Sequence, residues 1–237
     1  SIASGSDIAA HELPAEIEEG PGVVCVGYYR HPPNVDGAIW LAREVMPLVR
    51  KEIPEAWCKL VGKDPAPEVQ ELDDLPGVEV TGFVESLKPY LAEASVVAVP
   101  IRTGGGLRGK VLEAWASKKA IVAHEVACEG FACEDGKHLI KASDAQAFAN
   151  GVVRCIRDAK LRKSLGEAGH ALTEERYSCA AMARKYEQVY AKVRGIEPGT
   201  GDPNRNGKAG ALGAPPEVPR LILDEEKGEQ KKEVGSV

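Results

Sequence analysis

The sequence lacks long apolar stretches. None of its hydrophobic runs approaches the roughly 18 residues that predict a membrane-spanning helix, and no signal peptide is visible. We therefore expect no transmembrane segment. Hydrophobic residues still make up 43% of the 237 residues, which is enough to bury the core of one or two domains.

The sequence also lacks the cysteine and histidine spacings that are typical of metal sites, and the cysteine spacings typical of a disulfide framework. The six cysteines are scattered without a C-x-x-C pair, and only Cys128 and Cys133 lie close together. This spacing disfavours a disulfide framework or a zinc site, and it fits a reducing cytoplasm best. Cys25 and Cys58 lie in apolar runs, so we expect them to be small core residues. The five histidines show no spacing that suggests a metal site.

An excess of basic residues is lacking as well. The formal net charge is −6, and residues 1–20 carry five acidic residues and no basic ones. Residues 21–194 are nearly neutral, with 23 acidic and 24 basic residues, whereas residues 195–237 carry eight acidic and six basic ones. A nucleic-acid partner needs a basic face, so this balance argues against one. It leaves room for a local basic pocket.

Composition and pattern divide the chain into three segments. Residues 1–20 form an acidic lead-in, residues 21–194 alternate between strand-like and helical patterns, and residues 195–237 have the composition of a flexible tail. The alternation predicts an α/β fold, a Rossmann-like, doubly wound parallel sheet followed by C-terminal helices. The expected strands are 23–26, 57–61, 78–80, 96–99, 120–123 and 138–141. The main expected helices are 36–51, 87–94, one from 107, one from an N-cap at Asp144 to 157, 160–175 and 180–194.

The stretch from Ser95 to Ala123 carries the clearest functional signal. It consists of an apolar run, three glycines at 104–106, an amphipathic helix and a second apolar run. Glycines let a ligand approach the backbone closely, and the free N–H groups at a helix start favour an anion. Arg108 and Lys110 add two cations there, which oppose the helix dipole unless an anion lies between them and the backbone. This stretch is therefore predicted to bind a phosphate group.

Two shorter motifs leave alternatives open. Gly104, Gly106 and Gly109 fit the G-x-G-x-x-G pattern of dinucleotide-binding folds, with Glu125 about 20 residues further on. That pattern follows the fourth expected strand rather than the first, so an NAD-binding Rossmann domain is a less favoured alternative. The region also fits G-x-x-x-x-G-K, but Val111 stands where a P-loop has the serine or threonine that holds magnesium. A nucleoside triphosphatase is therefore disfavoured.

A series of motifs follows in a fixed order along the chain, which reads VVCVGYYRHPPNVD, KLVGKDP, VEVTGFVESLKPYL, VPIRTGGGLRGKVLEAW and EGFACEDGKHLI. In content and order this series resembles the C-terminal, donor-binding half of a family 4 glycosyltransferase with the GT-B fold. Even SIASGSDI resembles the segment that joins the two halves. The resemblance implies transfer of a sugar from a nucleoside diphosphate sugar, with retention, in polysaccharide biosynthesis. It implies no cofactor beyond this donor. It also implies a missing N-terminal acceptor-binding half, through which we expect any peripheral membrane contact.

The resemblance gives roles to individual residues. Glu113 aligns with the second glutamate of the family's E-x7-E motif, which holds the ribose hydroxyls of the donor. Arg108 and Lys110 are the expected catalytic cations, because positive charge stabilises a leaving diphosphate. Further expected donor-binding residues are Gly27, Gly82, Phe83, Val84, Gly104, Gly105, Gly106 and Leu107, with Arg30 replacing the family's basic residue after the first strand.

Two departures from the family pattern bear on activity. The first glutamate of the E-x7-E motif is replaced by Gly105, a loss that relatives with the GGG-x-R-x-K form share. No D-x-D motif is present, so we expect a reaction without a metal. A second interpretation stays open, that of a non-catalytic, degenerate transferase module used for assembly. As a fragment, the chain is expected to bind the donor but to turn over poorly without its other half.

Overall fold

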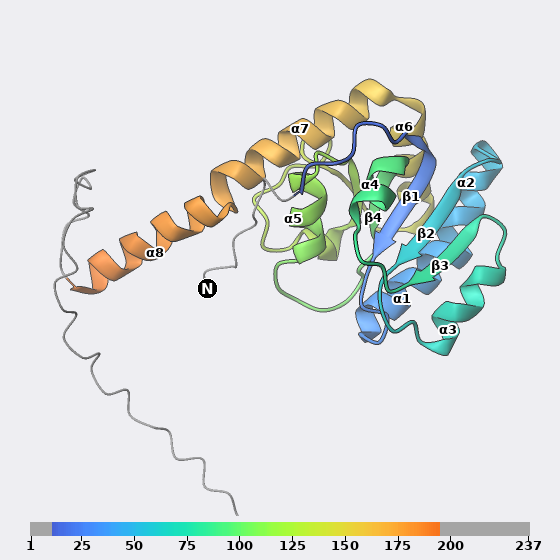
Figure 1. Ribbon diagram of the computed structural model, residues 1–237, viewed down its shortest axis with the longest axis horizontal. Coiled ribbons are helices and arrows are strands. Elements are labelled where there is room, and N and C mark those ends of the chain that lie inside the picture. Colours follow the sequence, from blue (N-terminus) through green and yellow to red (C-terminus); the bar gives the residue numbers. More distant parts are fainter. Residues whose placement is uncertain (1–10, 195–237) are drawn as a thin grey trace, which may run out of the picture. The chain divides into compact units, whose positions relative to one another are not determined.

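A six-stranded sheet forms the centre of the computed structural model, which describes residues 11–194 and the side chains of residues 11–190. The first half of the predicted lead-in (1–10) and the predicted tail (195–237) lie outside the described residues. Every strand pair is parallel, and the spatial order is β3-β2-β1-β4-β5-β6. Figure 1 labels the first four strands of this order. The strands are β1 (Gly20–Val26), β2 (Trp57–Val61), β3 (Val78–Gly82), β4 (Ala94–Val99), β5 (Ile121–His124) and β6 (Ile140–Ala142).

Helices cover both faces of the sheet, because successive residues of a strand point to opposite sides. Val23 belongs to a first core cluster with residues of α1, α2 and α6, whereas Val24 belongs to a second cluster with residues of α4, α5 and α8. The helical elements are α1 (Pro32–Trp40), the π-helical turn η2 (Leu41–Val45), α2 (Met46–Glu52), α3 (Pro67–Gln70), the 3-10 turn η3 (Glu71–Asp74), α4 (Lys88–Glu93), α5 (Gly109–Ala116), the 3-10 turn η4 (Glu125–Cys128), α6 (Ala145–Arg157), α7 (Ala159–Arg176) and α8 (Cys179–Arg194).

The predicted parallel α/β sheet is confirmed, but two helices begin elsewhere than predicted. The first helix begins at Pro32 rather than at residue 36. Proline suits the first helical position, because the N–H group that it lacks has no partner there in any case. The helix predicted from Leu107 begins at Gly109, and the extended residue Arg108 is its N-cap.

The helix predicted for residues 36–51 is also interrupted. Pro47 lies in the first turn of α2, directly after the π-helical turn η2. A proline has no backbone N–H to donate, and its ring crowds the carbonyl four residues earlier. The wider π-helical turn accommodates both defects without ending the helix. The buried stripe of Ala42, Met46 and Val49 continues through the interruption.

The strand order creates a topological switch point at the carboxyl ends of β1 and β4, and we call the region between the segments that follow these two strands the β1/β4 crevice. β1 pairs with β2 on one side and with β4 on the other. The chain leaves β1 toward α1 and leaves β4 toward α5, and these helices belong to opposite core clusters. Loops that diverge in this way mark the switch point at which doubly wound sheets bind their ligands.

The described part of the lead-in packs on the domain. Leu13 contacts the second core cluster. The Glu19 carboxylate accepts hydrogen bonds from Lys119 Nζ and from Arg162 Nη2, each over 2.6 Å. The Lys119 side chain is only 8% exposed, so this ion pair is shielded from solvent. Residues just before β1 are therefore fixed at the amino ends of the strands, opposite the β1/β4 crevice.

Substituting Gly37 by alanine is predicted to destabilise the fold by about 1–3 kcal/mol. A Cβ atom at Gly37 in α1 would lie 2.6 Å from the Pro100 carbonyl oxygen, so one backbone segment must move. Urea-induced unfolding measures the loss. Gly109→Ala is the control, because a Cβ atom there meets no described atom within 4 Å and alanine favours a helix. Equal losses in the two variants would contradict the steric explanation.

Candidate functional site

The segments predicted to bind phosphate meet at the carboxyl ends of the neighbouring strands β1 and β4. Gly27 follows β1, the glycine run 104–106 follows β4, and Lys110 lies in the first turn of α5. Because β1 and β4 are paired neighbours, their loops emerge next to one another. A direct contact joins the helices that follow the two loops, since Lys110 Nζ in the first turn of α5 donates a hydrogen bond to Asn34 Oδ1 in the first turn of α1 over 2.9 Å.

The glycine run adopts backbone conformations that other residues rarely adopt. Gly104 and Gly106 have φ angles of +91° and +88°, in the left-handed region. A Cβ atom at Gly105 or Gly106 would meet no described atom within 4 Å, so the outer side of the run is open. The backbone of Gly105 and Gly106 is therefore accessible to a ligand on that side.

The Lys110 side chain extends from the first turn of α5 to the first turn of α1. Its acceptor Asn34 is itself fixed, because Asn34 Nδ2 donates to the Tyr28 carbonyl over 3.0 Å. Burial lowers the pKa of Lys110, and the nearby positive charge of Arg108 lowers it further. A half-buried ammonium group with a single described hydrogen-bond acceptor is well placed to bind an anion.

Arg108 folds back over the glycine run. Its Nη1 donates to the Gly105 carbonyl over 2.8 Å, and its Nη2 lies 3.5 Å from the Thr103 carbonyl. Its Nε is buried and lacks a hydrogen-bond partner among the described residues. The Arg108 side chain makes no capping hydrogen bond to α5, so it does not occupy the first N–H groups of that helix. Two cations and the free N–H groups thus meet at one helix end.

Glu113 lies one turn after Lys110 on α5 and is half-buried. Val111 and Trp115 on the same helix are fully buried in the second core cluster, whereas the negative charge of Glu113 acts on Lys110. Leu107, just before the helix, packs partly against the same cluster. Glu113 is therefore placed beside the cations, while Leu107 contributes mainly to packing.

The residues predicted to contact a nucleobase lie farther along the same edge. Gly82 ends β3, and β2 separates β3 from β1, so the two strand exits are about 10 Å apart by strand spacing. Phe83 is 73% exposed, the highest value among the large hydrophobic side chains described. Val84 instead packs against the second core cluster. Arg30 is exposed beyond β1 and forms no ion pair with the residues that the structure describes.

A second charged group at the crevice escaped the sequence analysis. Arg102, which follows β4, donates to Asp36 in α1 through Nε and Nη2, over 3.0 and 2.6 Å. The Arg102 guanidinium also lies over the Trp40 ring, 5.3 Å from its centroid. The hydrogen bonds to Asp36 raise the pKa of Arg102. Asn34, Asp36 and Arg102 all lie inside the motifs quoted above. The sequence does not reveal that Asp36 and Arg102 pair, because they are 66 positions apart.

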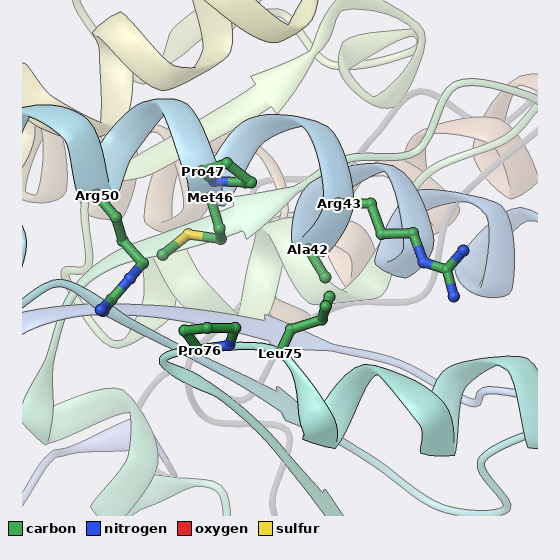
Figure 2. Close-up of a pocket in the computed structure, with 7 residues that line it drawn as sticks. All are labelled: Ala42, Arg43, Met46, Pro47, Arg50, Leu75 and Pro76. Atoms are coloured by element: carbon green, nitrogen blue, oxygen red, sulfur yellow. The ribbon is translucent and has the colours of Figure 1, made fainter.

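An apolar groove of about 500 Å³ lies elsewhere on the domain. Figure 2 shows Leu75 and Pro76 facing the helical residues across the groove, with Arg43 and Arg50 toward its two ends. Its lining includes none of the candidate site residues. The groove lies between the helix after β1 and the segment that enters β3, away from the glycine run.

Membrane-spanning helices and metal-binding clusters are both absent from residues 11–194. None of the helices there combines the length and the apolarity needed to cross a membrane. Histidine, cysteine, aspartate and glutamate side chains of this part of the chain form no group of three or more that could hold a metal ion.

The chain belongs to the family described as Glycosyl transferases group 1, which it matches over residues 20–158. That range contains all six strands and every candidate site residue. A similar protein is the uncharacterized 44.6 kDa protein in the cps region of Klebsiella pneumoniae, which is 23% identical over 163 residues. The match covers 65% of this chain but only 42% of that protein, so the chain spans less than half of this relative.

Solved structures share the fold. Anabaena Alr3699/HepE in complex with UDP and glucose has a TM-score of 0.63 at 16% identity, covering 80% of this chain and 56% of that one. Sucrose-phosphate synthase from Thermosynechococcus elongatus has a TM-score of 0.63 at 23% identity, covering 82% and 52% of the two chains. The C-terminal domain of a group 1 glycosyl transferase (LpcC) from Francisella tularensis has a TM-score of 0.57 at 18% identity, covering 73% of this chain and 99% of that domain. The predicted architecture of a GT-B C-terminal domain is thus confirmed.

Lys110→Met is predicted to stabilise the free chain at neutral pH, because it removes a half-buried charge. The folded-state pKa of Lys110 lies below its ordinary value of 10.5. The unfolded chain therefore binds more protons between the two pKa values, and the stability of the unsubstituted chain rises with pH across that window. The advantage of the variant in urea-induced unfolding should therefore shrink as the pH rises toward 10.5. The exposed Lys88→Met is the control, and a pH-independent loss of stability in Lys110→Met would contradict the prediction.

Proposed function

We propose that this chain is the donor-binding half of a retaining glycosyltransferase of the family 4 type. It would bind a nucleoside diphosphate sugar at the β1/β4 crevice, and the acceptor would be held by a separate half of the protein. One observation carries the proposal. The glycine run, the open end of α5 and Lys110 meet at the switch point of the sheet, where a doubly wound fold binds nucleotides.

The diphosphate is assigned to the glycine run and to the start of α5. The exposed backbone of the run allows close approach, and free N–H groups at a helix start bind anions. Arg108 and Lys110 would stabilise the negative charge that develops as the diphosphate leaves, which makes them the proposed catalytic residues. Binding an anion would also relieve the cost of holding Lys110 charged in a half-buried place.

The nucleoside is assigned to Glu113 and to the loop after β3. A carboxylate accepts hydrogen bonds from both hydroxyls of a ribose, and Glu113 lies one helical turn from Lys110. The exposed Phe83 ring offers an apolar surface for a base, flanked by Gly82 and Val84. Gly27 is proposed to contact the phosphates at the exit of β1, where a Cβ atom would lie 3.3 Å from Asn34 Cγ, and Arg30 is a further candidate cation for them.

The proposed sugar transfer would need no cofactor besides the donor. Positive charge on Arg108 and Lys110 takes the place that a metal ion has in other sugar transfers, so we propose a metal-independent reaction. Gly105 stands where the family pattern has its first glutamate, and the proposal requires activity to survive that change. The loss of this glutamate is also the observation that favours the non-catalytic alternative. That alternative predicts that the chain does not bind the nucleotide.

The proposed assignment of Glu113 predicts a selective loss of affinity. Glu113→Gln should weaken binding of the preferred nucleoside diphosphate by about 1.5–3 kcal/mol, roughly ten- to hundredfold, because a charged hydrogen-bond acceptor is lost. Binding of inorganic diphosphate should not change, because it has no ribose. Lys110→Met should weaken both ligands.

Calorimetric titration with UDP, GDP, ADP and inorganic diphosphate measures these changes. Glu174→Gln, an exposed carboxylate on α7, is the control. If Glu113→Gln weakens inorganic diphosphate as much as the nucleotide, Glu113 does not bind the ribose. If none of the nucleotides binds the unsubstituted chain, the non-catalytic alternative is favoured.

The retaining mechanism is tested with the chain joined to its remaining half. An active enzyme of this type should transfer an α-linked donor sugar to give an α-linked product, which NMR of the anomeric proton identifies at early time points. A β-linked product would contradict retention. Arg108→Lys should lower kcat more than it raises KM, because the guanidinium is proposed to act on the leaving diphosphate.

A further inference from the structure

The start of α1 lies along the segment that carries the glycine run. This segment, residues 100–108, connects β4 with α5, and we call it the glycine loop. At the beginning of the loop, a Cβ atom on Gly37 of α1 would lie 2.6 Å from the Pro100 carbonyl oxygen. Further along, a Cβ atom on Gly104 would lie 3.8 Å from Pro33 Cγ. The helix α1 therefore packs against the glycine loop from Pro100 as far as Gly104.

The start of α1 does not offer an anion site of its own. Its first two residues, Pro32 and Pro33, have no backbone N–H group. The next two N–H groups, those of Asn34 and Val35, both donate to the His31 carbonyl, over 2.9 and 3.1 Å. These residues therefore lack the free N–H groups that bind an anion at a helix start. What α1 contributes to the crevice is support for the neighbouring segments.

One pair of side chains fixes the beginning of the glycine loop to α1. Arg102 donates to the two carboxylate oxygens of Asp36 through Nε and Nη2, over 3.0 and 2.6 Å. A guanidinium group that binds a carboxylate through two parallel hydrogen bonds is fixed in direction as well as in distance. The same guanidinium lies over the Trp40 ring, one helical turn after Asp36. Two residues of α1 thus hold the Arg102 side chain.

The middle of the glycine loop lacks such links to the rest of the described structure. Arg108 donates to the carbonyls of Gly105 and Thr103, but these hydrogen bonds stay within the loop. Side-chain hydrogen bonds link the described loop to α1 only near its two ends. One link is made by Arg102, and the other is made just after the loop by Lys110.

Binding of the donor would affect these two links differently. Lys110 is proposed to contact the diphosphate, so its hydrogen bond to Asn34 competes with the ligand. The hydrogen bonds to Asp36 instead raise the pKa of Arg102, which keeps the guanidinium charged and paired. The Asp36–Arg102 pair is therefore the link that can hold the loop both before and after an anion binds.

We propose that Asp36 is a positioning residue for the donor, which acts through Arg102 to hold the glycine loop in its binding conformation before the nucleotide arrives. The inference rests on the proposed function, because that function assigns the glycine run to the diphosphate. A loop that is ordered in advance loses less conformational entropy when the ligand binds, so the affinity is higher. Asp36 itself needs no contact with the donor.

Calorimetric titration of the full chain with UDP, GDP, ADP and inorganic diphosphate measures the effect. Asp36→Asn keeps the size of the side chain but removes its charge. It should weaken the best-bound nucleotide and inorganic diphosphate by about tenfold each, because the loop must then be ordered on binding. Asp36→Glu keeps the carboxylate and should recover most of the affinity. The control Glu52→Gln removes an exposed ion-pair partner of Arg157, 3.1 Å away, and should change neither affinity.

Stability and a double variant separate positioning from a role in folding alone. The Asp36 and Arg102 side chains are 42% and 34% exposed, and an exposed ion pair contributes little to stability. Asp36→Asn and Glu52→Gln should therefore shift the urea midpoint by similar, small amounts. If Asp36 acts through Arg102, Asp36→Asn should cause no further loss of affinity in a chain that already carries Arg102→Gln.

A spectroscopic measurement tests the proposal without any ligand. Backbone order parameters from ¹⁵N relaxation report the motion of Thr103 and of the glycine run in the unliganded chain. They should fall below about 0.6, the range of flexible segments, in Asp36→Asn. They should keep the values of the unsubstituted chain in Asp36→Glu and in Glu52→Gln.

Three results would overturn the proposal. The first is tighter binding by Asp36→Asn, which would mean that Asp36 withholds Arg102 from direct contact with the ligand. The second is an equal loss of affinity from Asp36→Asn with and without Arg102→Gln. The third is that the order parameters of the loop do not change in Asp36→Asn. If neither the nucleotides nor inorganic diphosphate bind the unsubstituted chain, the proposed function fails, and the order parameters still decide whether Asp36 holds the loop.

Discussion

The hydrogen bond between the Lys110 ammonium group and the Asn34 side chain joins the first turns of the two helices on which the site depends, α5 and α1. It connects segments 76 residues apart, one after β1 and one after β4. The two helix starts approach each other because β1 and β4 are paired neighbours, although the helices belong to opposite core clusters. Pairing of Asp36 with Arg102 adds a second link across the same crevice. The crevice is thus a consequence of strand order, and its charge is a consequence of these few side chains.

The crevice combines features that oppose stability. Arg108 has a buried Nε without a described partner, and Lys110 carries its charge in a half-buried place. Such features persist at functional sites when the surrounding structure compensates for them. Here the compensation comes from two core clusters that cover both faces of the sheet. A bound anion would pair with both cations, which is the reason to expect one.

Much of the fold could be predicted from the sequence, because strands buried on both faces appear as short apolar runs and the Asp144 side chain caps its helix as predicted. Strand order could not, since a period of two residues specifies the faces of a strand and not its neighbours. The glycine run and Lys110 were predicted from local spacing alone. The roles of Asn34 and Arg102 were missed because their partners lie far away in the sequence.

The central claim is that a nucleoside diphosphate binds at the β1/β4 crevice, and an amide-resolved NMR titration of the chain with UDP, GDP and ADP tests it most directly. The account predicts that at least one of the three produces saturable shifts at Gly27, at the glycine run and in the first turn of α5. Shifts confined to the apolar groove near Met46 and Pro76, or no shifts at the glycine run with any of the three nucleotides, would contradict it.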